Sequence, residues 1–211
     1  MFFVQKIETP IKQIKMSFRL LLICFLLVFG YSIIIAQNLE LKNDEMVKHH
    51  FTDAEIKNFE KIIEYFEKYL RSNCHDVIIE NCYTSYFKNL ASFEDNGDLK
   101  IQIPKDLEMN MLKDFDDIFL NEIWIDWGRF NNEGRKENYL YYNMKGKYFR
   151  FLENLALKND RIDYYLKGYK LLGDFSPTLI VGTIKDFENC NFNDPKEKLL
   201  IAIHQFSINR F

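Results

Sequence analysis

Apolar residues recur every three or four positions over much of this chain, which is the spacing of one face of an α-helix. The clearest stripe consists of Ile56, Phe59, Ile62, Ile63, Phe66 and Leu70. Thr52 precedes this stripe and Glu55 follows three residues later, a pair that predicts a capping box at a helix start. The pattern therefore predicts a helix over residues 53–72.

Further stripes of the same spacing predict most of the remaining fold. They cover residues 80–92, a stretch from Pro104 toward Trp124, a stretch from Lys147, residues 160–173, a short helix after Ser176-Pro177 and a last one after Asp194-Pro195. In the last of these, residues 199–203 are apolar on every side, which predicts burial on all sides.

A few segments do not follow helical spacing. Leu99, Ile101 and Ile103 alternate with polar residues, which favours a short strand or an extended loop, and residues 139–142 fit a strand or a helix equally well. We therefore expect a mostly α, single-domain multi-helix bundle over residues 51–211. It should contain about seven helices and at most a short strand or hairpin.

The N-terminal 36 residues have the composition of an export signal. Arg19 is the last charge before an apolar run over residues 20–35, and Ala36 closes this run as a small residue. Met16 is an alternative start. The competing interpretation is a retained single-pass anchor, because residues 20–36 reach the short limit for crossing a bilayer. Both interpretations place residues 38–211 outside the cytoplasm, in the periplasm or secreted, and residues 37–50 are expected to form a flexible lead-in.

Composition narrows the class of protein. The aromatic content of 16% makes a disordered chain improbable. The leader carries four of the 28 basic residues and one of the 31 acidic ones, which leaves 24 basic against 30 acidic residues. A net charge of about −6 argues against a general nucleic-acid binder, which would be strongly basic.

Three cysteines remain after the leader, namely Cys74, Cys82 and Cys190. In an oxidising compartment, Cys74 and Cys82 are the natural disulfide pair because they are close in sequence. On a continuous helix their Cα atoms would lie about 12 Å apart, whereas a disulfide needs about 4.4–6.8 Å. The disulfide therefore requires a bend between the two residues.

Catalytic chemistry has one weak candidate, the aromatic and acidic patch over residues 122–129. On a helix, Glu122 and Asp126 would share one face, and a carboxylate pair beside Trp124 and Trp127 could perform acid–base work on a sugar. The simpler interpretation is that the tryptophans pack in the core or at its rim while the two carboxylates face solvent.

A basic and aromatic segment over residues 135–150 is the candidate for ligand binding. The candidate binding residues in this segment are Arg135, Lys136, Tyr141, Tyr142, Lys147 and Arg150. Cations interleaved with rings can hold an anionic polymer. The alternative, which we favour, is internal pairing, because residues 94–126 hold ten acidic residues and only three basic ones.

The remaining reactive residues point to no cofactor and no metal. His49, His50, His75 and His204 share no metal-binding spacing, and a lone histidine in an apolar helix such as His204 is usually buried and bonded to a carbonyl. Cys190 has no histidine close in sequence to activate it. The chain also lacks the glycine-rich motifs that cradle phosphates or dinucleotides.

These observations favour a non-catalytic binding or interaction module of the cell envelope, whose partner is an envelope glycan or another envelope protein. One alternative is an envelope glycan hydrolase that uses Glu122 or Asp126. Another is a subunit of a partner-dependent assembly. Nucleic acid is not an expected partner, and membrane contact is expected only through residues 20–36 if they are retained.

Overall fold

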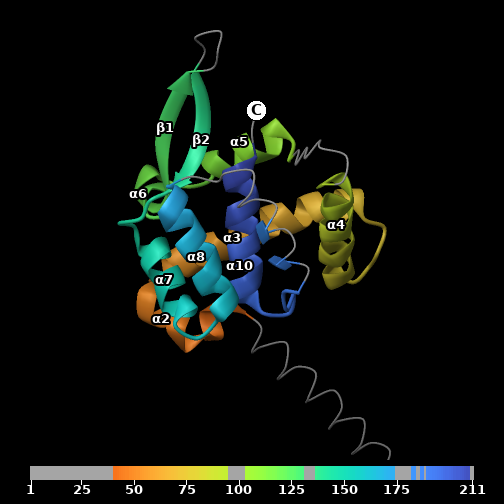
Figure 1. Cartoon of the computed structure of the whole chain (residues 1–211), viewed down its shortest axis with the longest axis horizontal. Helices are drawn as coiled ribbons and strands as arrows, with labels where there is room; N and C mark the ends of the chain where they lie inside the picture. The colour runs from red at the N-terminus through yellow and green to blue at the C-terminus, as the bar shows by residue number, and fades with distance from the viewer. Residues whose placement is uncertain are drawn as a thin grey trace, which may run out of the picture.

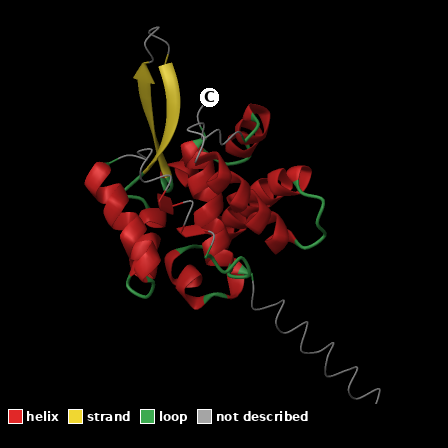
Figure 2. Cartoon of the chain, turned by 45° about the vertical axis from the view of Figure 1, so that its right-hand side comes forward, coloured by secondary structure: helices red, strands yellow, loops and turns green. Residues whose placement is uncertain are grey.

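The computed structural model describes residues 40–94, 103–130, 136–173, 182–183, 186–187 and 189–209. Within these ranges the chain is mostly α-helical with one two-stranded sheet, which confirms the expected fold class (Figure 2). The helices are η1 (Leu41–Asn43), α2 (Glu45–His50), α3 (Asp53–Asn73), α4 (Ile79–Glu94), α5 (Lys105–Lys113), α6 (Asp117–Asn121), α7 (Lys147–Ala156), α8 (Asp160–Leu172) and α10 (Pro195–Ile208). The strands are β1 (Trp124–Phe130) and β2 (Lys136–Tyr142).

Helix α3 begins where the sequence predicts. The Thr52 Oγ1 accepts the Glu55 backbone N–H at 3.3 Å, and the Glu55 carboxylate accepts the Thr52 backbone N–H at 2.8 Å. This is the predicted capping box, which satisfies two backbone donors at the helix start. All six residues of the apolar stripe are buried, so the face of α3 that they form lies against the core.

Helices α3 and α4 pack against each other and are joined by a disulfide. The first ends at Asn73 and the second begins at Ile79, so the chain bends between Cys74 and Cys82. This bend brings their Cα atoms to 5.5 Å, and the predicted disulfide is present.

The core is centred on α10, which lies near the middle of the helical body in Figure 1. Asp194 accepts the Lys196 backbone N–H at 2.9 Å and Pro195 occupies the first turn, as expected for a helix start. Every residue from Leu199 to Ile208 is buried, which confirms the expected burial on all sides. Helix α10 packs against α3 and β2, and α7 packs against α8.

The strands β1 and β2 form an antiparallel hairpin that projects from the helical body (Figure 1). Its register places Trp124 opposite Tyr142 at the base, Trp127 opposite Tyr139, and Phe130 opposite Lys136 at the far end. Figure 1 shows the base of the hairpin at the helical body and the other end of its strands pointing away from it.

The predicted helix from Pro104 toward Trp124 is wrong in its second half. Helix α5 ends at Lys113, the short helix α6 follows, and the chain becomes strand at Trp124. Asp116 starts the new helix by accepting the Phe119 backbone N–H at 2.8 Å. The strand forms because residues 124–130 pair with residues 136–142, a contact that spacing within either segment does not reveal.

The expected flexible lead-in over residues 37–50 is corrected from residue 40 onward. This stretch forms η1 and α2, and Asp44 caps α2 by accepting the backbone N–H groups of Met46 and Val47. Leu41 and Val47 are buried in the core. Two apolar residues in a polar stretch are too few to show helical spacing in the sequence, but both are buried in the core of the folded chain.

Several predicted features lie outside the described residues. They are the leader over residues 1–36, the alternating residues Leu99 and Ile101, and the helix start at Ser176-Pro177. Among the described helices, none has the length and apolar composition that crossing a membrane requires.

Candidate functional site

Glu122 lies where α6 ends and the hairpin begins, and it holds this junction to the start of α7. Its carboxylate accepts the Lys147 backbone N–H at 2.7 Å, and its backbone carbonyl accepts the Tyr148 N–H at 3.2 Å. A carboxylate is stabilised at a helix N-terminus because unpaired N–H groups and the helix dipole converge there. Glu122 therefore acts as a cap for α7.

The close approach of these two segments requires a glycine at position 146. A Cβ atom added to Gly146 would lie 2.2 Å from the Glu122 carbonyl oxygen, well inside contact distance. The Asn143 backbone N–H also donates to the Ile123 carbonyl at 2.9 Å, and the Asn143 side chain donates to the Asn121 carbonyl at 2.6 Å. The turn after β2 is thus locked against the turn before β1.

The expected carboxylate pair on one helix face does not exist. Glu122 is the C-terminal cap of α6, whereas Asp126 lies in β1 opposite Leu140. The i and i+4 relation requires a continuous helix through both residues, and the change from helix to strand at Trp124 removes it.

The aromatic residues at the hairpin base belong to the core. Trp124 is buried, and its indole Nε1–H donates to the Ser207 Oγ of α10 at 2.7 Å. Tyr142 is also buried, and its backbone N–H donates to the Tyr169 hydroxyl of α8 at 2.9 Å. Tyr141 beside it is buried as well. For these residues, the packing interpretation accounts for the position better than ligand binding does.

The basic residues of the 135–150 segment are used in different ways. The Lys147 Nζ pairs with the Glu55 carboxylate of α3 at 2.5 Å, so its charge is matched within the chain, but by a residue outside the acidic 94–126 stretch from which we expected the partners. Burial raises the pKa of Glu55, but hydrogen bonds from Lys147 and Thr52 outweigh this effect and hold the pKa below its usual value. Arg150 is exposed.

One basic and one aromatic candidate belong to the part of the hairpin beyond its base. Lys136 pairs opposite Phe130 and Trp127 opposite Tyr139 in the strand register. Arg135 lies outside the described residues. Of the predicted binding residues, Trp127 and Lys136 therefore lie in the described strands beyond the hairpin base.

His204 takes part in a buried string of polar side chains that sequence reasoning missed. The Tyr165 hydroxyl lies 3.0 Å from the His204 Nδ1 and 2.9 Å from the Tyr142 hydroxyl. A hydroxyl has one proton, so both contacts are satisfied if His204 donates to Tyr165 and Tyr165 donates to Tyr142. Burial lowers the pKa of His204 to about 3, which keeps the ring neutral.

A second buried group that sequence reasoning missed is Glu108 of α5. It is buried beside Asn209, whose side-chain amide donates to the Glu108 carboxylate and to the Ile103 carbonyl, and accepts the Ile103 N–H. Burial raises the pKa of Glu108 to about 7. The contact between Glu108 and Asn209 joins α5 to the end of α10, although the two residues are 101 positions apart in the sequence.

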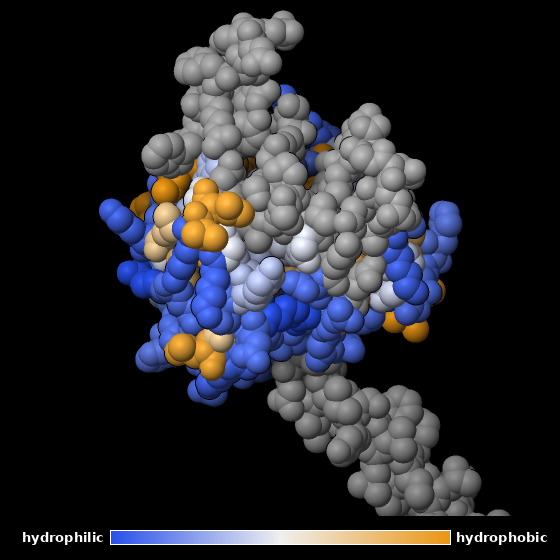
Figure 3. Space-filling model, viewed as in Figure 1, coloured by the Kyte–Doolittle hydropathy of each residue, from blue (hydrophilic) through white to orange (hydrophobic). Residues whose placement is uncertain are grey.

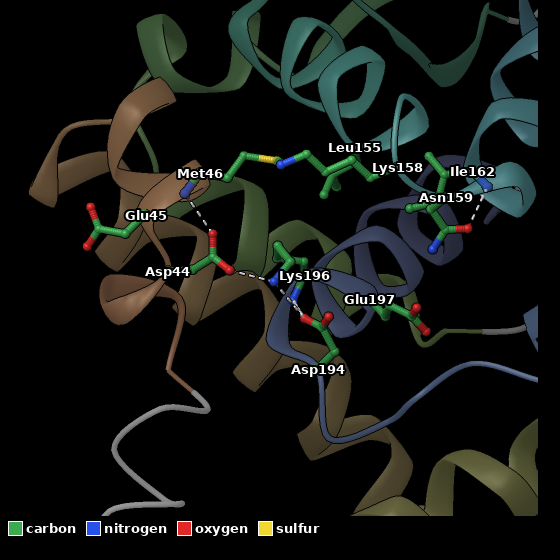
Figure 4. Close-up of a pocket in the computed structure, with 10 residues that line it drawn as sticks. All are labelled: Asp44, Glu45, Met46, Leu155, Lys158, Asn159, Ile162, Asp194, Lys196 and Glu197. Atoms are coloured by element: carbon green, nitrogen blue, oxygen red, sulfur yellow. Dashed lines mark hydrogen bonds and ion pairs between the residues drawn. The ribbon is translucent and has the colours of Figure 1, made fainter.

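The largest of three described cavities has a volume of about 380 Å³ and lies where the first turns of α2, α8 and α10 meet. Its polar lining comes chiefly from the residues that cap these helices, Asp44, Asn159 and Asp194. Figure 4 shows the Lys196 ammonium between two of these carboxylates, 2.5 Å from Asp44 and 3.3 Å from Asp194.

Three carboxylates of this cavity already have structural partners. Asp44 and Asp194 each cap a helix and pair with Lys196, while Glu197 pairs with Arg161 at 2.6 Å. Two smaller cavities of about 280 and 240 Å³ lie along α3. None of the three is lined by Glu122 or Trp124.

Cys190 is half-buried, and burial raises the pKa of its thiol. A raised pKa disfavours the thiolate that a nucleophile needs. Within the described part of the chain, no three His, Cys, Asp or Glu side chains gather closely enough to hold a metal ion.

Comparison with known protein families, curated proteins and solved structures gives no match to this chain.

Proposed function

We propose that this chain is a non-catalytic interaction module of the cell envelope, in which the β1–β2 hairpin contacts the partner. The observation that carries this proposal is the position of the hairpin, which is held at its base and extends away from the helical body (Figure 1). Its sheet contains only these two strands among the described residues, so each strand keeps one edge without a strand neighbour. An unpaired edge can accept a further strand from another protein.

The anchoring of the hairpin base supports this role. Trp124 bonds to Ser207 of α10 and the Tyr142 backbone bonds to Tyr169 of α8, so the base is fixed to two helices. An element held in place before binding loses less conformational freedom when it binds. The helical body then serves as the scaffold that presents the hairpin.

The residues of the projecting part suit a protein partner. The register brings Trp127 opposite Tyr139 and Arg129 opposite Glu137. Tryptophan, tyrosine and arginine are the residue types most enriched where proteins meet. The same surface would serve a subunit of a larger assembly.

The hydrolase alternative is less well supported. Its candidate acid, Glu122, caps α7, and its candidate stacking residue Trp124 is buried against α10. A glycan-cleaving site would instead require an accessible carboxylate beside an open groove.

Export across a membrane is part of the proposal. It is supported by the leader composition over residues 16–37 and by the Cys74–Cys82 disulfide, since structural disulfides persist in oxidising compartments. N-terminal sequencing of the cell-envelope fraction should find Gln37 as the first residue. An uncut chain recovered from the cytoplasm would contradict export.

Site-specific photo-crosslinking in producing cells tests the hairpin. A benzoyl-phenylalanine introduced at position 139 should give one discrete adduct of higher mass, whereas the same group at the exposed control position Glu64 on α3 should give none. Equal adduct formation at the two positions, or none at position 139, would contradict the proposal.

An assay on purified cell-wall glycan tests the alternative. The protein should release no soluble fragments, and the Glu122→Gln variant, which keeps an acceptor for the Lys147 N–H, should behave identically. Fragment release that disappears in Glu122→Gln would favour the hydrolase.

A further inference from the structure

The outward face of α8, together with the residue three positions before it, carries four exposed apolar side chains. Its inward residues, among them Ile162 and Leu166, are buried, whereas Tyr164 is 69% exposed and Leu171 84% exposed. Leu172 is 51% exposed, and Leu157, just before the helix, is 82% exposed. Figure 3 shows apolar groups near both ends of α8 on the same face of the molecule.

The spacing of these residues is symmetric along the chain. Leu157 and Leu171 each lie seven positions from Tyr164. If a second α8 ran antiparallel across the first, with the twofold axis near Tyr164, Leu157 of one copy would lie opposite Leu171 of the other. The two Tyr164 side chains would meet near the axis. A twofold interface must be complementary to itself in this way.

The charges of α8 follow a similar symmetry, about a point one residue farther along the chain. Its first half carries Asp160 and Asp163, and its later half carries Lys167 and Lys170. With an axis near residue 165, Asp160 faces Lys170 of the other copy and Asp163 faces Lys167 of the other copy. An antiparallel arrangement therefore brings opposite charges together along its whole length.

The ion pairs that these lysines make within one copy do not prevent such an exchange. Lys167 pairs with Asp163 at 2.6 Å, and Lys170 pairs with Glu153 at 2.6 Å, with all four side chains substantially exposed. Exposed ion pairs contribute little free energy, so either lysine can exchange its partner at small cost.

We propose that the outward face of α8 binds a second copy of this chain in an antiparallel, twofold arrangement. Apolar side chains of this size bury roughly 60–120 Å² each by the transfer free energy of a buried leucine. Four from each copy cover about 500–1,000 Å² in total, and the charged side chains beside them supply the rest of the about 1,200 Å² at the lower end of stable interfaces. This surface is separate from the hairpin, so the dimer and the hairpin contact can each be tested without the other.

Sedimentation velocity on two charge variants tests the arrangement. The cationic variant is Asp160→Lys/Asp163→Lys, and the anionic variant is Lys167→Glu/Lys170→Glu. The unaltered protein should dimerise at micromolar concentrations. Each variant alone should show a dissociation constant at least about tenfold higher, because like charges then face each other across the axis.

An equimolar mixture of the two variants is the decisive sample. Cationic and anionic helices should pair with each other, so the mixture should recover the dimer affinity that each variant alone has lost. A matched control is the exposed ion pair of α2, in which Glu45→Lys and Lys48→Glu should leave the dissociation constant unchanged.

The Leu171→Asp variant tests the apolar part and should raise the dissociation constant without lowering helix content in circular dichroism. The proposal is overturned if the unaltered protein stays monomeric at all concentrations tested. It is equally overturned if both charge variants dimerise as the unaltered protein does, or if their mixture stays monomeric while both are folded.

Discussion

The α3–α4 pair and the β1–β2 hairpin are both two-element units, but different kinds of contact hold them. The α3–α4 pair is specified by short-range features, namely the Thr52–Glu55 capping box and the Cys74–Cys82 disulfide eight residues apart. The hairpin base depends on partners much farther along the chain, since Trp124 bonds to Ser207 and Tyr142 to Tyr169. A unit built from local contacts can be recognised in its own sequence, whereas a unit built from distant contacts cannot.

The same difference distinguishes the packed helices from the hairpin that we propose as the contact surface. Aromatic rings of α3 and α4 pack against each other inside the protein. The rings of Phe66 and Tyr83, for example, meet edge to face with their centroids 5.8 Å apart. The hairpin buries Trp124, Tyr141 and Tyr142 at its base, and Trp127 and Tyr139 come farther along its strands. Changes at the hairpin base should therefore act on stability, and changes beyond it should act on binding.

The largest effect is expected at the base of the hairpin. Trp124→Ala should lower the free energy of unfolding by about 3–5 kcal/mol, because it removes a large buried ring and leaves a cavity against α10. Trp124→Phe keeps much of the packing and should cost about 1–3 kcal/mol through the lost bond to Ser207. Urea denaturation measures the free energy of unfolding of both variants. Equal losses in the two would contradict the packing of the Trp124 ring against α10.

Removing the disulfide should have the next largest effect. The Cys74→Ser/Cys82→Ser variant should lose about 2–4 kcal/mol, because the unfolded chain is no longer restricted by the closed loop. The measurement is the urea midpoint with and without reductant. The double variant itself should be insensitive to reductant, and a reductant effect of the same size in it would contradict the assignment.

The buried Glu108 should make stability depend on pH. Its pKa is about 7 in the folded chain against the usual 4.5, so the folded state holds the proton more tightly. The resulting stabilisation is fully present below about pH 4.5 and is lost as the pH rises through about 7, by about 3 kcal/mol in total.

Glu108→Gln should remove this component of the pH dependence while keeping the contact with Asn209. The measurement is the melting temperature between pH 4.5 and 8. Its slope against pH should be smaller in Glu108→Gln than in the unaltered protein. An unchanged slope would show that Glu108 does not titrate in the folded chain as described.

The smallest effect is expected at the start of α3. Thr52→Ala should cost about 0.5–2 kcal/mol because it removes the acceptor for the Glu55 backbone N–H. Thr52→Ser retains the hydroxyl and should cost less. A melting midpoint that is the same in Thr52→Ala as in the unaltered protein would contradict the capping box.

The fold was predictable where an element carries its own signals. Helices α3 and α10 each have a cap and an apolar pattern in one continuous segment, and both form as expected. The strand at residues 124–130 was not predictable in this way, because Glu122 and Asp126 fit a helix equally well until residues 136–142 are known to pair with it.

The candidate site was predictable only in part for the same reason. The spacing of Cys74 and Cys82 was enough to predict both their disulfide and the bend it requires. Internal pairing of the 135–150 segment holds for Lys147, but its partner Glu55 lies 92 residues away. The Glu108–Asn209 contact spans 101 residues, and no local pattern marks either residue as buried.

The central claim is that the helices present the hairpin and the hairpin makes the contact. The most direct measurement is the yield of photo-crosslinked adduct at position 139, compared with position 64, in the chain with Trp127 and in its Trp127→Ala variant. We predict an adduct at position 139 only, reduced in the variant while the melting temperature stays unchanged. An adduct of equal yield at position 64, or one at position 139 that is insensitive to Trp127→Ala, would contradict the claim.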